Sequence, residues 1–267
     1  MISSVASTSR TPETRHARHP AASSAEAARL GQGLRRSRFL QRLRRPTIEL
    51  FLAAGSIRTV ERDMRFQPED GANDWLLVVA SGAVKTHMSS RTGSERLVGI
   101  TGVGGVLNAA PVITETAESP GVTALVVTTL LTIPGRIVRD EMAKAPEVGR
   151  AIAEELSLQQ LVEQRAVAAM VDLDAAGRVA YRLTQLARDW GTETPRGRVI
   201  DLPLTQEELG AWAHVSRESA AKALQVLRAE GIVSTGRKLL VVHSLEALEE
   251  RAGVEIIDLT DLAAHLA

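Results

Sequence analysis

The sequence contains no cysteine, and this one absence removes several classes of function. A disulfide scaffold, a zinc site with cysteine ligands, an iron–sulfur cluster and a thiol nucleophile all need that residue. Aromatic residues make up only 3% of the chain, so the core must be built from Val, Leu, Ile and Ala. No apolar run approaches the ~18 residues of a membrane-spanning helix, and no signal-peptide segment is recognisable. We therefore expect a cytoplasmic protein with no membrane partner.

The formal net charge of zero conceals an uneven distribution along the chain. Residues 1–45 hold ten arginines and two glutamates, a charge of +8, which leaves −8 for the remainder. The first part of this segment is rich in Ser and Ala and has few apolar residues to bury, so residues 1–34 are expected to form a disordered basic tail. Such a tail can contact DNA phosphates, although a solvated tail without a binding role is the simpler interpretation.

Residues 35–140 change from a helical to a strand pattern. Apolar residues spaced along one face predict a helix over 35–52. Short runs of Val, Ile, Leu and Thr follow, separated by Gly-containing turns, at 75–79, 83–87, 97–100, 122–127 and 130–133. Many short strands at a spacing of ~8–12 residues indicate an antiparallel β-barrel or jelly roll rather than β-α-β units. We assign residues 35–140 to one β domain.

A long helix is predicted next, over 147–169, because no Gly follows Gly149 and no Pro follows Pro146 within it. A helix of that length after a compact barrel usually packs on a partner subunit, so residues 141–173 are expected to form a dimerisation helix and hinge. Asp172 and Asp174 are candidate N-caps for a second amphipathic helix over 178–190, with Gly177 marking the junction. A third domain, 174–252, and a tail, 253–267, complete the division.

Two short helices and a hairpin are predicted within 205–242. Thr205 and Glu208 form a capping box at the start of a helix over 206–213, and Ser216 caps a second helix over 217–230. Gly231 suits the left-handed position that ends this helix, and a hairpin over 232–242 and a short acidic helix over 245–251 follow. Two helices separated by about three residues and followed by a hairpin describe a winged helix-turn-helix.

The second of these helices carries the candidate base-reading residues. Arg217, Glu218 and Lys222 lie in its first two turns, where Arg can read guanine, Glu can accept from cytosine N4, and Lys can reach guanine or a phosphate. Ser216 stands with Arg217 at the start of this helix, where exposed side chains would meet base edges. Four further residues, at the start of the first helix and in the hairpin, are placed for phosphate contacts: Thr205, Gln206, Arg237 and Lys238. Residues 203–251 hold six basic and seven acidic side chains, so the prediction rests on order and spacing rather than on a basic patch.

The stretches Leu204-Thr-Gln-Glu-Glu-Leu-Gly210 and Val215-Ser-Arg-Glu-Ser-Ala-Ala-Lys222 closely resemble the DNA-binding domain of the CRP/FNR family of bacterial transcription regulators. Upstream, Ser81-Gly-Ala-Val-Lys85 and Gly104-Gly-Val-Leu107 resemble that family's β domain more loosely. The resemblance implies an α+β fold: a cyclic-nucleotide-binding-like antiparallel β-barrel or jelly roll, a long dimerisation helix and a C-terminal winged helix-turn-helix. It also implies that Arg217 and Glu218 read bases and that Lys222 replaces the family's usual Arg. His214 stands where the family usually has Gly in the turn.

The resemblance also locates a phosphate-binding cassette, and its residues depart from the pattern that binds cyclic nucleotides. Ala109 stands where those members have the Glu that holds the ribose, and Glu118 stands where they have the Arg that neutralises the phosphate. We therefore expect no dependence on cyclic AMP and no cofactor. His87 is the single histidine of the barrel, too few for a cupin-type metal site and unremarkable as a haem ligand.

The function predicted is a sequence-specific, non-enzymatic transcription regulator that binds double-stranded DNA as a homodimer at a pseudo-palindromic operator. An activator would also contact RNA polymerase, although no motif identifies a surface for it. Two alternatives stay open: a non-specific architectural DNA binder that uses the basic tail, and a cupin-like barrel enzyme whose winged helix binds protein. Salt dependence would mark the first alternative, and a bound metal the second.

Overall fold

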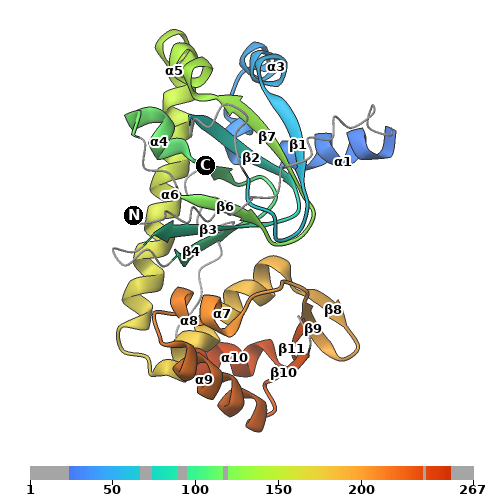
Figure 1. Cartoon of the computed structure of the whole chain (residues 1–267), viewed down its shortest axis with the longest axis vertical. Coiled ribbons are helices and arrows are strands. Elements are labelled where there is room, and N and C mark those ends of the chain that lie inside the picture. The colour runs from blue at the N-terminus through green and yellow to red at the C-terminus, as the bar shows by residue number, and fades with distance from the viewer. Residues whose placement is uncertain (1–23, 67–73, 90–94, 117–119, 237–238, 254–267) are drawn as a thin grey trace, which may run out of the picture.

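The computed structural model describes residues 24–66, 74–89, 95–116, 120–236 and 239–253. Two bodies of structure lie one above the other, and one long helix, α6 (Pro146–Met170), runs beside the upper one and leads into the lower one (Figure 1). We call the strands β1–β7 and their connections, residues 56–134, the β region. We call residues 175–252 the winged-helix region. No described helix has both the length and the hydropathy needed to cross a membrane.

The β region contains two antiparallel sheets. One has the strand order β1-β7-β2-β5 and the other β4-β3-β6. The described residues do not close into a single barrel, but the arrangement is the one expected for a cyclic-nucleotide-binding-like domain. The bounds of the strands are Ser56–Val60 (β1), Trp75–Ser81 (β2), Val84–Ser89 (β3), Glu95–Thr101 (β4), Val106–Leu107 (β5), Gly121–Ala124 (β6) and Thr128–Pro134 (β7).

Strand β2 is buried on both faces, as its unbroken apolar sequence suggests. Leu77 and Val79 point into a cluster with side chains of the second sheet, such as Val84. Leu76 and Val78 point the other way, into a cluster formed with the surrounding helices. These helices are α2 (Arg38–Gln41), α3 (Arg45–Ala54), α4 (Ala109–Thr114), α5 (Gly135–Lys144) and α6.

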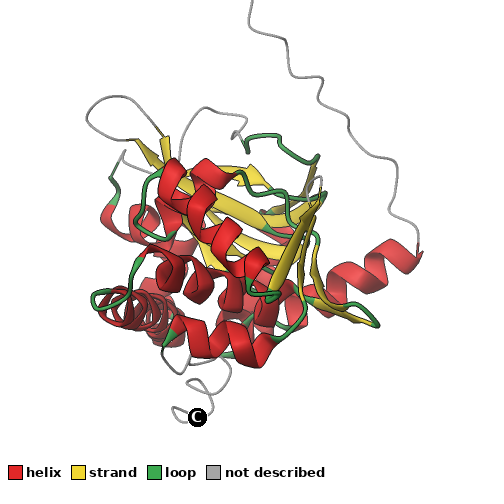
Figure 2. Cartoon of the chain, turned by 90° about the horizontal axis from the view of Figure 1, so that it is seen from below, coloured by secondary structure: helices red, strands yellow, loops and turns green. Residues whose placement is uncertain are grey.

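The N-terminal prediction needs a correction. Residues 24–35, most of which were expected to belong to a disordered tail, form helix α1 (Ser24–Arg35), and its C-terminal part lies against β2. The helix projects from the body of the molecule at its other end (Figure 2). At Gly33 a Cβ atom would stand 1.6 Å from the carbonyl oxygen of Ala80, so this close approach requires glycine. The helix is held by tertiary packing, which composition does not reveal. Residues 1–23 lie outside the described part.

The predictions for the helices that flank the β region, and for α7 after them, are partly confirmed. The long helix predicted over 147–169 is confirmed as α6. The helix predicted over 35–52 is divided, because Ser37 caps α2 and Pro46 lies in the first turn of α3. Gly177 is not a junction, since it lies within α7 (Ala175–Trp190), whose N-cap is Asp174.

The winged-helix region contains α7 and, in chain order, a series of short elements. They are β8 (Thr192–Thr194), β9 (Gly197–Ile200), α8 (Gln206–Trp212), α9 (Arg217–Ala229), β10 (Val233–Gly236), β11 (Leu239–Val242) and α10 (Leu245–Ala252). The strands form one sheet in the order β10-β11-β9-β8, in which β8 was not predicted. Leu183, Leu209 and Leu227, from three different helices, are buried in its core.

Candidate nucleic-acid interface

Helix α8 begins with the predicted capping box. The Thr205 hydroxyl accepts a hydrogen bond from the Glu208 backbone N–H at 3.1 Å, and Glu208 Oε2 accepts one from the Thr205 backbone N–H at 2.8 Å. These two hydrogen bonds satisfy two backbone N–H groups that lack helical partners, and they fix the geometry at the start of α8. Thr205 and Gln206 are exposed there, as a phosphate-contacting role requires.

The turn between α8 and α9 is tight. His214 adopts a φ of 54°, the left-handed conformation that its replacement of Gly predicts. Gly210 lets the two helices approach, because a Cβ atom there would stand 3.1 Å from the carbonyl oxygens of Val215 and Ser216. The relative orientation of α8 and α9 is therefore fixed by close backbone contact.

Helix α9 has one buried face and one exposed face. Ser216 caps it, accepting from the Ser219 backbone N–H at 3.1 Å. The buried face is formed by Ala220, Ala223, Leu224 and Leu227. Arg217, Glu218 and Lys222 are all exposed. The helix start lowers the pKa of Glu218, through hydrogen bonds from the residue's own backbone N–H and from Ser216, so this side chain is an anionic acceptor at neutral pH.

The hairpin formed by β10 and β11, which we call the wing, is bonded to α9 by the side chain of Arg228. Arg228 Nη1 donates to the Thr235 hydroxyl at 3.1 Å, which joins α9 to β10. Strands β10 and β11 pair as the predicted hairpin, from Val233 with Val242 to Gly236 with Leu239. The two basic residues predicted for the tip, Arg237 and Lys238, lie outside the described residues.

The degenerate cassette is packed against the surrounding helices. Ala109 is buried in α4, and the carbonyl oxygen of Val106 accepts from Gln159 Nε2 of α6 at 3.1 Å. Arg139 Nη1 donates to the carbonyl oxygen of Val112 at 2.7 Å. Glu118, the second departure from the cyclic-nucleotide pattern, lies outside the described residues. Within the described part, no group of three or more His, Asp or Glu side chains forms a candidate metal site.

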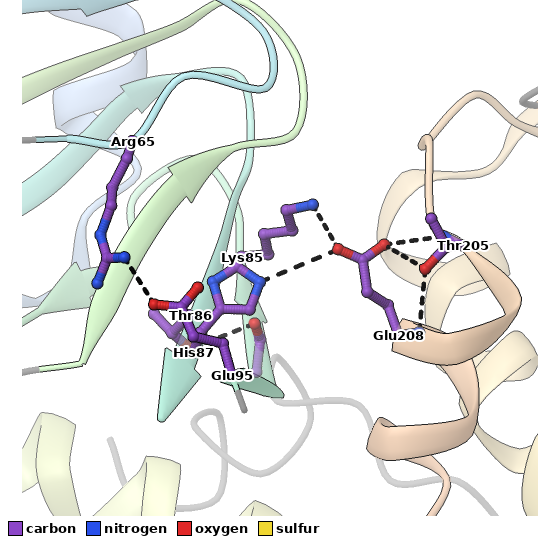
Figure 3. Close-up of polar contacts among 8 residues, drawn as sticks. Arg65, Lys85, Thr86, His87, Glu95, Thr205 and Glu208 are labelled. Atoms are coloured by element: carbon purple, nitrogen blue, oxygen red, sulfur yellow. Dashed lines mark hydrogen bonds and ion pairs between the residues drawn. The ribbon is translucent and has the colours of Figure 1, made fainter. Parts of the chain in front are cut away.

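A polar contact that sequence reasoning missed joins the β region to α8 (Figure 3). Lys85 Nζ of β3 donates to Glu208 Oε1 at 2.5 Å, and His87 Nε2 lies 4.0 Å from the same oxygen. Burial alone would raise the pKa of Glu208, but the nearby His87 ring and the hydrogen bonds from Lys85 and the Thr205 backbone outweigh it and lower the pKa to about 2. Glu208 is thus an ionised carboxylate shared by two parts of the chain.

Apolar side chains continue this contact. Leu97 of β4 is only 3% exposed and belongs to the hydrophobic cluster of the winged-helix region, although it comes from the β region. Trp190, at the end of α7, lies against Gly102, where a Cβ atom would meet the indole nitrogen at 3.0 Å. No local sequence pattern marks these three contacts, because each joins residues far apart in the chain.

Comparisons with known proteins agree with this geometry. Residues 177–251 match the family profile described as "Crp-like helix-turn-helix domain". The chain is 26% identical over 184 residues to the CRP-like cAMP-activated global transcriptional regulator of Mycobacterium tuberculosis, which covers 69% of this chain and 82% of that protein. It is 24% identical over 216 residues to the global nitrogen regulator of Synechocystis sp., covering 78% and 96% respectively.

Solved structures share the fold. The c-di-GMP responsive global regulator CLP of Xanthomonas campestris aligns with a TM-score of 0.63 and 24% identity, over 74% of this chain and 99% of that chain. A CRP-family transcriptional regulator from Thermus thermophilus aligns with a TM-score of 0.63 and 20% identity, over 75% and 98%.

The fold and the exposed face of α9 define a helix-turn-helix DNA-binding protein with a cyclic-nucleotide-binding-like β domain. Within that class, the chain carries a Crp-like helix-turn-helix domain and is similar over most of its length to transcription regulators of the CRP/FNR family.

Proposed function

We propose that this regulator binds a pseudo-palindromic DNA operator as a homodimer, without depending on cyclic AMP. The observation that carries the proposal is the exposed strip of Arg217, Glu218 and Lys222 on a helix whose start is fixed by the Ser216 cap. In a major groove, Arg217 would donate to guanine and Glu218 would accept from cytosine N4. Lys222 would reach a guanine or a phosphate, and Ser216 would face the base edges at the helix start. Phosphate contacts would come from Thr205, Gln206, Arg237 and Lys238.

The homodimer is proposed along α6. Exposed residues recur along α6 and its C-cap at alternating spacings of four and three, which is the spacing of a coiled-coil seam with polar residues at its middle positions: Ala153, Ser157, Gln160, Gln164, Val167 and Val171. A hollow of about 470 Å³ between α2 and α6, with Phe39 and Leu158 in its lining, adjoins this seam. A two-fold dimer presents two copies of α9, so the half-sites would lie one helical turn apart, about 34 Å.

Independence from cyclic AMP is supported by the packing around the cassette. Ala109 has no side chain that could hold a ribose, and α6 bonds the cassette directly through Gln159. Similarity to the family does not fix the signal, because the named relatives include a cAMP-activated regulator, a c-di-GMP responsive regulator and a nitrogen regulator.

The remaining parts of the proposal follow from DNA binding. We place the protein in the cytoplasm with its DNA, and contact with RNA polymerase stays a prediction for the case of an activator. We propose the division 35–140, 141–173 and 174–252, with α1 added to the first domain because it packs on β2.

The test is selection of bound duplexes from random DNA, run with and without cyclic AMP. We expect the same pseudo-palindrome in both arms, and a sequence recovered only with the nucleotide would contradict the proposed independence. The Arg217→Ala variant should then bind the selected duplex more weakly by about 1–3 kcal/mol and lose preference at one base position. The matched control is Arg136→Ala, at an exposed arginine of α5. Equal affinity of both variants would remove Arg217 from the interface.

Enrichment of no sequence, with steep salt dependence, would favour the non-specific architectural binder.

A further inference from the structure

We infer that Lys85 and Glu208 are positioning residues for DNA binding: their ion pair holds the winged-helix region on the β region with α9 turned outward. This inference rests on the proposed function, because it concerns the affinity of the same interface. Lys85 lies in β3, far from α9 in the sequence, and it is assigned no contact with DNA. Its effect would pass through Glu208 to the start of α8.

The ion pair is well placed to hold the two regions together. The side chains of Lys85 and Glu208 are only 12% and 18% exposed, and Nζ and Oε1 are 2.5 Å apart. Solvent therefore screens this pair much less than a surface ion pair. Leu97 and the contact of Trp190 with Gly102 enclose the same interface with apolar surface. Three independent contacts thus join β3, β4 and the following loop to α7 and α8.

Glu208 connects this interface to the DNA-reading helices through its two oxygens. Oε1 accepts from Lys85, while Oε2 accepts from the backbone N–H and the hydroxyl of Thr205 in the capping box. Helix α8 is in turn held on the start of α9 by the close approach of Gly210. A constraint applied at Glu208 is therefore transmitted to α9 through packed backbone rather than through a flexible loop.

The direction of the effect follows from where α9 lies. Figure 1 shows α9 on the side of the winged-helix region away from β3 and β4. Docking therefore leaves Arg217 and Lys222 exposed, so it holds the reading face available rather than covering it. A dimer needs both copies of α9 at a fixed separation, and a region free to swing spends only part of its time there. Apparent affinity falls in proportion to that fraction.

The experiment measures the dissociation constant of the full-length protein for the selected duplex, by fluorescence anisotropy at several salt concentrations. The variants are Lys85→Ala, Glu208→Gln and the double variant. Gln can still accept from the Thr205 backbone N–H, so Glu208→Gln keeps the helix start and removes the charge. Lys85→Arg keeps the charge, and Lys144→Ala is the matched control at an exposed lysine of α5. Thermal unfolding of each variant checks the fold.

We expect Lys85→Ala and Glu208→Gln each to weaken binding about tenfold, with the double variant no weaker than either single one. Lys85→Arg should restore most of the affinity, and Lys144→Ala should bind like the wild type. The slope of log affinity against log salt should stay unchanged in Lys85→Ala, because loss of a lysine that contacts a phosphate would reduce it by about 0.9.

Several outcomes would overturn the inference. Unchanged affinity in both single variants would show that the pair positions nothing, and tighter binding would show that docking restrains α9 instead. Additive losses in the double variant, or a reduced salt slope, would mean that Lys85 touches DNA itself. These outcomes all presuppose that the wild type selects a duplex. If it selects none, the proposed function fails and the inference falls with it.

Discussion

The packing of α1 against β2 can be tested by substituting alanine at two glycines of α1. Gly33 faces Ala80, and a Cβ atom there would stand 1.6 Å from the carbonyl oxygen and 2.7 Å from the carbonyl carbon. Gly31 lies two residues earlier, and a Cβ atom there would have no neighbour within 4 Å. Since both residues are helical, the two substitutions change helix propensity alike and differ only in packing.

The magnitudes can be worked from these distances. Replacing Gly by Ala in a helix interior gains about 0.5–1 kcal/mol, so Gly31→Ala should stabilise the protein by that amount. At Gly33 the new methyl group needs about 2 Å more room than the structure offers, and overpacking of this kind costs about 1–3 kcal/mol. The contact is with backbone, which cannot rotate away as a side chain can. Gly33→Ala should therefore be less stable than Gly31→Ala by about 1–3 kcal/mol.

Urea unfolding followed by circular dichroism would measure the free energy of unfolding of both variants and the wild type. Hydrogen exchange of the α1 amides would show whether the helix has left β2, since a detached helix of 12 residues is marginal in water. If Gly33→Ala is as stable as Gly31→Ala and keeps its amide protection, α1 does not rest on β2 and the argument from Ala80 is wrong.

Three further predictions concern the helix-turn-helix and its supports. The pKa of the Glu208 carboxylate is lowered from 4.5 to about 2, so its stabilising effect is complete above pH 4.5 and is lost as the pH falls toward 2. The stability difference between the wild type and Glu208→Gln should therefore shrink over that window, as measured by thermal unfolding. His214→Gly should raise the free energy of unfolding, measured by urea titration, by about 0.5–1 kcal/mol, because it removes a side chain from a left-handed position. A lower free energy of unfolding would mean that the imidazole makes a stabilising contact. The side chain of Arg182 is 1% exposed, and it donates to the Trp212 carbonyl at 3.0 Å and to Glu163 at 2.9 Å. Arg182→Ala should therefore lower the free energy of unfolding by about 3–5 kcal/mol, and a loss near zero would show that these bonds do not stabilise the fold.

The sequence predicted best what local signals encode. Thr205 and Glu208, Ser216 and Gly231 mark helix ends through hydrogen bonds within a few residues, and all of these positions have the predicted caps or backbone conformation. His214 likewise adopts the left-handed conformation that its place in the turn requires. The roles of the predicted DNA-contacting side chains remain predictions.

The sequence failed where partners lie far apart in the chain. Helix α1 has an unpromising composition and is held by β2, some fifty residues later. Strand β1 alternates half-buried and exposed residues, and among the described strands it pairs with β7 alone, so it lacks the apolar run that identified strands such as β2 and β7. The contact of Lys85 with Glu208 spans 123 positions, and neither residue announces it. Such contacts depend on the folded chain, which local patterns do not describe.

The burial of Leu97 bears on how this protein can change in evolution. A leucine buried in a neighbouring core contributes about 1.5–3 kcal/mol, and here the β region supplies it to the cluster that supports α7, α8 and α9. A winged helix transplanted onto another β domain would lack that side chain and would expose the surface around Trp190. The two halves of this chain are therefore not freely interchangeable modules. A substitution in β4 also changes the stability of the winged-helix region, so natural selection acts on the β region and the winged-helix region together.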